Sequence, residues 1–130
     1  MSGPAAPSTD AWLREAKADP SRDNCGMYLF HNGVVRATAK AAVRRGEEPR
    51  QVTGMMFDYD EAKVAAAVEA ARKLPGIYYV RVWMNRGRLE VGDDIMLVLI
   101  GGDIRPRIVD ALNILVGELK DNCVTETELF

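Results

Sequence analysis

The chain has 130 residues, of which 48% are hydrophobic and 28% charged, the composition of an ordinary globular protein with one domain. Its formal net charge of −2 gives no general attraction to nucleic acid or to anionic membranes, so any anion-binding site has to be local. No apolar run approaches the roughly 18 residues of a membrane-spanning helix. The composition therefore disfavours both a nucleic-acid-binding protein and a membrane protein.

The N-terminal segment is predicted to contribute one short helix. Residues 1–7 are rich in proline and small side chains, so they are expected to be disordered, and they lack the hydrophobic region of a secretory signal. A helix is expected from Thr9 or Asp10, either of which can cap it, through Ala18, with Trp12 as an anchor. The Asp-Pro-Ser sequence that follows ends this helix.

We therefore divide the chain into an N-terminal extension, residues 1–22, and a domain of residues 23–130. The two cysteines, Cys25 and Cys123, are too few for a disulfide framework, and they do not have the spacing of a redox or metal motif. Both are expected to be small buried hydrophobes in a reduced, cytoplasmic protein.

The domain is predicted to begin with a strand over residues 25–36. Met27, Leu29 and His31 alternate onto one face, and Gly33 interrupts the strand. A glycine inside a strand often marks a bulge or the close approach of another group to the backbone. His31 is the only histidine, and no cysteine or carboxylate stands at metal-ligand spacing around it, so no metal is expected.

A polar and basic segment, residues 37–50, is predicted to be a mobile loop. Its basic residues are Lys40, Arg44, Arg45 and Arg50. We expect a solvated loop, with contact to a substrate or to an acidic partner surface as the alternative.

The middle of the chain alternates strands with one clear helix. Residues 52–59 resume a strand pattern, and Asp60 can cap a helix to Leu74 whose apolar residues recur at helical spacing. A Pro-Gly pair stops that helix. Residues 77–84 and 88–91 then form two strands separated by a turn.

The C-terminal part carries the most apolar strand and a second long helix. Residues 95–100 are apolar without interruption, which is typical of a strand buried on both faces. A helix with a wide apolar stripe follows from Arg105 to about Lys120, and residues 122–130 are either a short strand or a flexible end. The resulting order of elements predicts an α+β domain with a mixed or antiparallel sheet and packed helices.

Two basic residues stand at the ends of this last helix. Arg105 and Lys120 are fifteen positions apart, so they are separated by about 22 Å along the axis, too far to hold one small anion together. If both are functional, Arg105 of one subunit has to meet Lys120 of another. With Arg36 at the end of the first strand, these cations predict a site for an anionic small molecule in a symmetric dimer.

The order of several short motifs resembles one known family. They are Gly-Val-Val-Arg at residues 33–36, Phe-Asp-Tyr at 57–59 before a helix, Gly-Arg-Leu-Glu-Val-Gly-Asp-Asp-Ile at 87–95, and the helix of 105–120. Between Met27 and Lys120 the chain resembles the large, catalytic subunit of molybdopterin synthase, the MoaE family. The resemblance implies a MoaE-like single domain of the α/β hammerhead type.

The resemblance also implies a reaction and partners. Such subunits form homodimers, and each protomer binds a small ubiquitin-like, MoaD-like sulfur carrier, which gives a possible heterotetramer. Two sulfur transfers from the carrier's thiocarboxylate convert cyclic pyranopterin monophosphate into molybdopterin, the dithiolene of the molybdenum cofactor. No metal or organic cofactor is implied for the subunit itself.

Site residues follow from the resemblance position by position. Arg36 matches a substrate-binding arginine at the end of the first strand, and the adjacent Val34 and Val35 are included with it. Arg105 matches the arginine of a histidine-arginine pair that the neighbouring protomer contributes around the substrate phosphate. Lys120 matches the lysine most closely tied to catalysis. A guanidinium can hold a phosphate with two hydrogen bonds, and a lysine in a partly dry cationic pocket can act on the reacting groups.

Two positions depart from the family pattern. Ile104 stands where the family has the histidine of the pair, and Thr127 falls about where it has a second lysine. Three interpretations therefore stay open: an active sulfurtransferase, a non-catalytic or regulatory paralogue that keeps the dimer and the carrier or phosphate site, and an unrelated α+β dimer that binds another phosphorylated metabolite. Lys120 has a purely structural alternative, because a lysine in a last helical turn complements the helix dipole.

Overall fold

The structure is a computed structural model, and it describes residues 6–40, 44, 46 and 51–130. In chain order the elements are α1 (Thr9–Ala18), a 3-10 turn (Pro20–Asn24), β1 (Met27–Val34), β2 (Gly54–Tyr59), α3 (Glu61–Arg72), β3 (Ile77–Met84), β4 (Gly87–Glu90), β5 (Asp94–Gly102), α4 (Arg105–Glu118), a π-helical turn (Leu119–Cys123) and β6 (Val124–Leu129). This order confirms the predicted alternation of helices and strands. Every pairing between these strands is antiparallel.

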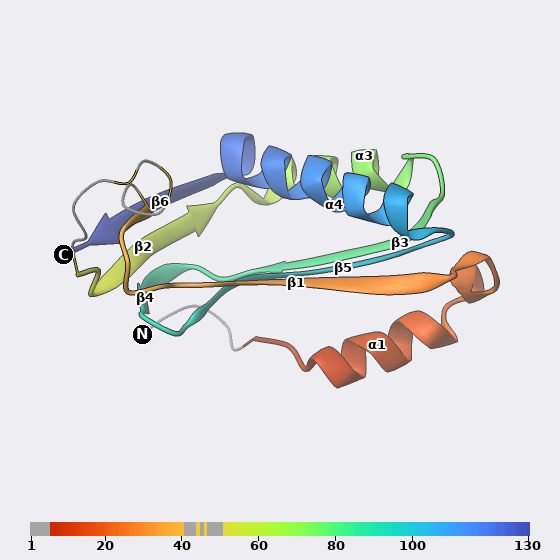
Figure 1. Cartoon of the computed structure of the whole chain (residues 1–130), viewed down its shortest axis with the longest axis horizontal. Helices are drawn as coiled ribbons and strands as arrows, with labels where there is room; N and C mark the ends of the chain where they lie inside the picture. The colour runs from red at the N-terminus through yellow and green to blue at the C-terminus, as the bar shows by residue number, and fades with distance from the viewer. Residues whose placement is uncertain (1–5, 41–43, 45, 47–50) are drawn as a thin grey trace.

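The first sheet has the strand order β1-β5-β3 and lies between helices on both faces (Figure 1). Its central strand β5 is buried from Ile95 to Ile100, as the uninterrupted apolar run predicts. Val98 and Ile100 belong to the main core with α3 and α4, whereas Leu97 and Leu99 pack on the opposite face beneath α1. Burial on both faces makes this sheet the centre of the molecule.

Helix α1 is held against the first sheet by its aromatic anchor. Trp12 is 5% exposed and packs with Ala16 against Leu97 and Leu99, while the guanidinium of Arg81 lies 4.5 Å from the Trp12 ring centroid. The N-cap differs from the prediction of Thr9 or Asp10: the hydroxyl oxygen of Ser8 accepts the Ala11 N–H at 3.2 Å. The cap lies one residue earlier because Thr9 already begins the helix.

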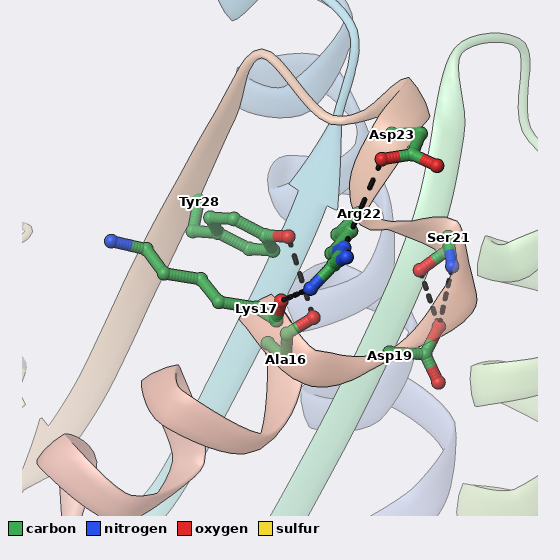
Figure 2. A network of polar contacts seen from close by, with 7 residues as sticks. All are labelled: Ala16, Lys17, Asp19, Ser21, Arg22, Asp23 and Tyr28. Carbon is green, nitrogen blue, oxygen red and sulfur yellow. Dashed lines mark hydrogen bonds and ion pairs between the residues drawn. The ribbon is translucent and has the colours of Figure 1, made fainter.

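The connection between α1 and β1 is fixed by local polar contacts (Figure 2). A carboxylate oxygen of Asp19 accepts the Ser21 N–H at 2.9 Å and its hydroxyl at 2.5 Å, which lowers the pKa of Asp19 below its usual value. The Tyr28 hydroxyl of β1 reaches the Ala16 carbonyl at 3.5 Å. These contacts turn the chain from α1 into the first strand.

The second sheet has the strand order β4-β2-β6 and lies at one end of the first (Figure 1). The acidic tail, predicted to be a short strand or a flexible end, is a strand: β6 pairs with β2 from Tyr59↔Val124 to Gly54↔Leu129. Phe57 faces the core at 2% exposure, whereas Met56 on the other face is 45% exposed. This sheet is therefore covered on one face only.

The end of β1 carries the bulge that Gly33 predicted. The register with β5 shifts between Gly33 and Val34, and the strand ends there rather than at residue 36. Val35 then exchanges backbone hydrogen bonds with the turn after β4, donating to Asp93 and accepting from Gly92. The bulge thus turns the chain out of the first sheet.

The predicted mobile loop, residues 37–50, is described only in part. Residues 41–43, 45 and 47–50 lie outside the described residues, and so do 1–5 of the N-terminal segment that was predicted to be disordered. Arg45 and Arg50 of the basic cluster are among them. Within the described part, an antiparallel bridge joins Thr38 to Gln51.

In the same described part, no helix is both long enough and apolar enough to cross a membrane. Nor do three or more His, Cys, Asp or Glu side chains there gather in a way that would hold a metal ion.

Candidate functional site

A pocket of about 140 Å³ lies where the two sheets meet, at the end of β1. It is lined by four basic residues, two carboxylates and three apolar residues: Arg36, Lys40, Arg44, Lys120, Glu126, Glu128, Val34, Met55 and Ile95. The walls come from both sheets, from the segment after β1 and from the turn after α4. Such a pocket offers an apolar wall for a ring, cations for an anion and carboxylates for hydrogen-bond donors.

Arg36 enters the pocket from the segment that follows the β1 bulge. Its Nε donates to the Thr38 carbonyl at 3.1 Å. Among the described residues its two terminal nitrogens make no hydrogen bond. The hydrogen bond from Nε fixes the orientation of the guanidinium, and the remaining N–H donors are available to bind an anion such as phosphate.

The side chains of the adjacent residues Val34 and Val35 point to different sides of the chain. Val34 is 44% exposed and lines the pocket, whereas Val35 is 2% exposed and packs in the main core. Only Val34 of this predicted pair has its side chain at the site. Val35 anchors the end of β1 through its side chain and its two backbone hydrogen bonds, and so positions Arg36.

Lys120 lies in the π-helical turn that extends α4, and its side chain lines the same pocket as Arg36. A π-helical turn is wider than an α-helical one and occurs often at functional sites. Lys120 also acts on His31 of β1: partial burial first, and the Lys120 charge second, lower the pKa of His31 below its usual 6.5. A His31 pKa below 6.5 keeps the imidazole mostly neutral at pH 7, so the positive charge of the pocket comes from its lysines and arginines.

Six of the lining residues were not predicted as site residues, and three of these are joined by polar contacts: Lys40, Glu126 and Glu128. The Lys40 ammonium pairs with a Glu126 oxygen at 3.2 Å, and the Lys40 backbone N–H donates to a Glu128 oxygen at 2.9 Å. The two carboxylates thus hold the segment after β1 against β6. The alternation of glutamates with threonines in the tail was the available signal, but only the pairing with β2 tells which of them face inward.

That pairing is specific. Glu126 stands opposite Phe57 and Glu128 opposite Met55, so both glutamates share the inner face with buried residues. Thr127 stands opposite the exposed Met56, on the outer face of the sheet. Thr127 does not line the pocket.

Arg105 is not brought to this pocket within one chain. It is exposed at the first residue of α4, and the helix of Arg105–Glu118 separates it from Lys120. The preceding Ile104 is 53% exposed and provides no side-chain cap. The three predicted cations therefore divide into Arg36 with Lys120 at one pocket, and Arg105 at the far end of α4.

The family of the chain follows from a comparison with protein-family models. The model described as MoaE protein matches residues 7–122. The chain belongs to the MoaE family. The match includes helix α1 and the elements through α4, whereas strand β6, with Glu126 and Glu128 of the pocket, follows its end.

Solved structures with MoaE-type folds agree with this assignment. Molybdopterin synthase from Staphylococcus aureus is 17% identical, with a TM-score of 0.72 over 97% of this chain and 88% of that one. The MoaE protein of Burkholderia ambifaria is 17% identical, with a TM-score of 0.71 over 98% of this chain and 84% of that one. At these identities the likeness shows the fold, and it confirms the predicted MoaE-like α+β architecture.

A third structure contains two kinds of subunit. The complex of subunits 1 and 2 of molybdopterin-converting factor from Helicobacter pylori is 19% identical, with a TM-score of 0.65 over 95% of this chain and 80% of that one. No curated protein sequence matches this chain.

Proposed function

We propose that this MoaE-family chain is the large subunit of a molybdopterin synthase, acting in the cytoplasm on cyclic pyranopterin monophosphate. Family membership supports a role in molybdenum cofactor biosynthesis. The observation that carries the proposal is that Arg36 and Lys120, from opposite ends of the chain, line one pocket with an apolar wall of Val34, Met55 and Ile95.

The chemistry assigned to these residues is sulfur transfer. The carrier's thiocarboxylate sulfur attacks a carbon of the pterin side chain and forms a carbon–sulfur bond, while the carbon–oxygen bond at that carbon breaks and the oxygen leaves with the electron pair and takes up a proton. The carrier is then joined to the substrate through an acyl–sulfur bond. Water then attacks the acyl carbon and the acyl–sulfur bond breaks. The carrier leaves with an ordinary carboxylate, and the sulfur stays on the pterin.

Each cation has a part in these steps. Arg36 holds the phosphate, for which its guanidinium is shaped. The Lys120 ammonium stabilises the negative charge that develops on oxygen and sulfur during transfer and hydrolysis. Because His31 is mostly neutral at pH 7, it does not compete with Lys120 for that charge.

The sulfur donor is a small MoaD-like carrier with a Gly-Gly tail. The Helicobacter pylori relative, solved as a complex of two subunits, supports a partner of this kind. The tail would enter the pocket from its open side and present its thiocarboxylate beside Lys120.

The decisive experiment replaces Lys120 and measures product. With thiocarboxylated carrier and cyclic pyranopterin monophosphate, Lys120→Met should reduce molybdopterin formation by roughly 10²–10³-fold, the effect of removing one stabilising donor. Lys73→Met, which removes an exposed lysine at the end of α3, should leave the rate unchanged. Equal rates for the two variants would refute a catalytic Lys120.

Arg105 completes the site in a homodimer, entering from the neighbouring protomer. The separation of about 22 Å along α4 excludes a contact with the Lys120 pocket of its own chain. Arg105→Met and Lys120→Met should each be inactive alone, yet mixed dimers should recover activity, because one of the two sites then has both residues. No recovery in mixed dimers would place Arg105 outside the site.

A second candidate is a paralogue that keeps the dimer and the carrier site without sulfur transfer. The inward-facing Glu126 and Glu128 favour it, because they reduce the positive charge of the pocket, and Thr127 supplies no second lysine. Carrier binding without product formation by the unmodified chain would select this alternative.

A further inference from the structure

The pocket contains more negative charge than the binding of a phosphate alone would favour. Glu126 and Glu128 line the same cavity as Arg36 and Lys120. A carboxylate beside a phosphate site weakens anion binding through like-charge repulsion. At least one of the two carboxylates should therefore have a role other than phosphate binding.

The two carboxylates have different partners. Glu126 is neutralised by the Lys40 ammonium at 3.2 Å. Glu128 holds only the backbone N–H of Lys40, at 2.9 Å, through its Oε2 atom. Among the described residues, Glu128 Oε1 makes no hydrogen bond and Glu128 has no ion-pair partner. Glu128 is therefore an uncompensated, half-buried acceptor at the cavity.

The apolar wall of the pocket indicates the shape of the ligand. Val34, Met55 and Ile95 offer a surface for the face of a flat ring. A carboxylate accepts most favourably from two adjacent N–H donors, as it does from an arginine fork. The pocket thus fits a flat heterocycle that has such a donor pair on one edge and an anionic group elsewhere.

We infer that Glu128 determines specificity by accepting hydrogen bonds from the 2-amino group and the adjacent ring N–H of a pterin, while Arg36 and Lys120 hold its anionic group. This assignment rests on the proposed function for the identity of the ring. Glu126 keeps Lys40 in place, and so keeps the segment after β1 against β6. Guanine nucleotides carry the same donor edge, so the test includes one.

The test compares the binding of pterin-6-carboxylate with that of lumazine-6-carboxylate, in which an oxo group replaces the 2-amino group. Fluorescence titration of the full-length protein in its native oligomeric state should show roughly tenfold or stronger preference for the pterin, since hydrogen bonds to a charged acceptor have that effect. Glu128→Gln should bring the two affinities together, because the amide presents its own donors to the ring edge.

Two controls keep the result interpretable. Glu90→Gln removes an exposed carboxylate from β4 of the same sheet, and it should keep the pterin preference. Binding of inorganic pyrophosphate should be unchanged or tighter in Glu128→Gln, because a negative charge leaves the pocket while Arg36 and Lys120 remain. Weaker pyrophosphate binding would mean a disturbed pocket and would overturn the assignment.

The other outcomes are equally decisive. A pterin preference that survives Glu128→Gln, or a wild-type protein without preference, overturns the inference. Tighter, Glu128-dependent binding of guanosine monophosphate than of the pterin overturns the choice of ring. Molybdopterin formation without pterin preference would refute this inference alone, whereas pterin preference without product would refute only the proposed reaction.

Discussion

The two three-stranded sheets of this protein differ in what covers them. The sheet β1-β5-β3 lies between α1 on one face and α3 with α4 on the other, whereas β4-β2-β6 exposes one face to solvent (Figure 1). The pocket lies where they meet, with Val34 and Ile95 from the first and Met55, Glu126 and Glu128 from the second. The first sheet is buried on both faces, and the second contributes the two carboxylates of the pocket.

The largest expected effect tests the role of the first sheet in stability. Leu99 of β5 is 0% exposed, so Leu99→Ala leaves a cavity beneath α1 and should lower the free energy of unfolding by about 2–5 kcal/mol. Met56→Ala on the open face of the second sheet, where the side chain is 45% exposed, should stay within about 0.5 kcal/mol of wild type. Urea unfolding followed by circular dichroism measures both, and equal losses would remove the distinction between the sheets.

A smaller effect, on binding rather than stability, is expected at the junction. Arg36→Met should weaken the binding of inorganic pyrophosphate roughly tenfold, because it removes a charge-assisted donor pair from the pocket. Arg88→Met removes the same charge from an exposed position of β4 that does not line the pocket. Isothermal titration calorimetry compares the pyrophosphate affinities of the two variants. The unfolding curves of both variants should coincide with that of the wild type. A loss of stability in Arg36→Met would give Arg36 a structural role.

The first sheet and helix α3 were predictable from sequence. A strand that is buried on both faces needs apolar residues throughout, and that pattern is visible in the sequence. An uninterrupted apolar run predicts β5, helical spacing with an aspartate cap predicts α3, and the glycine in β1 predicts the bulge. Asp60 does cap α3, accepting the Lys63 N–H at 3.1 Å. In each case the residues that determine the local structure are neighbours in sequence.

The site was less predictable because its residues meet only through tertiary pairing. Arg36 and Lys120 were found through the family resemblance, and the structure places both at one pocket. Lys40, Glu126 and Glu128 were not found: half-exposed glutamates in β6 alternate with threonines and give no apolar periodicity. Which of them point inward depends on the β2 register, since a shift of one residue would reverse their faces.

The smallest expected effect concerns His31, a side chain of the first sheet whose pKa is affected by Lys120 of the pocket. Its pKa is lowered in the folded protein, so the unfolded chain binds a proton more readily, and stability rises with pH in that range. The His31 contribution is fully present above the unfolded pKa of 6.5 and is lost as pH falls toward the lower, folded value. The lowered pKa values of Asp19 and Asp58 make stability depend on pH in more acidic solution, near and below pH 3.8.

His31→Gln should therefore flatten the dependence of unfolding free energy on pH between about 5 and 7, because no other histidine is present. Lys120→Met removes one of the two causes of the shift, so the His31 pKa, followed by the imidazole proton resonances, should rise while burial keeps it below 6.5. An unchanged His31 pKa in Lys120→Met would mean that the Lys120 charge does not influence His31. His31 in the first sheet would then have no electrostatic interaction with the turn after α4 that carries Lys120.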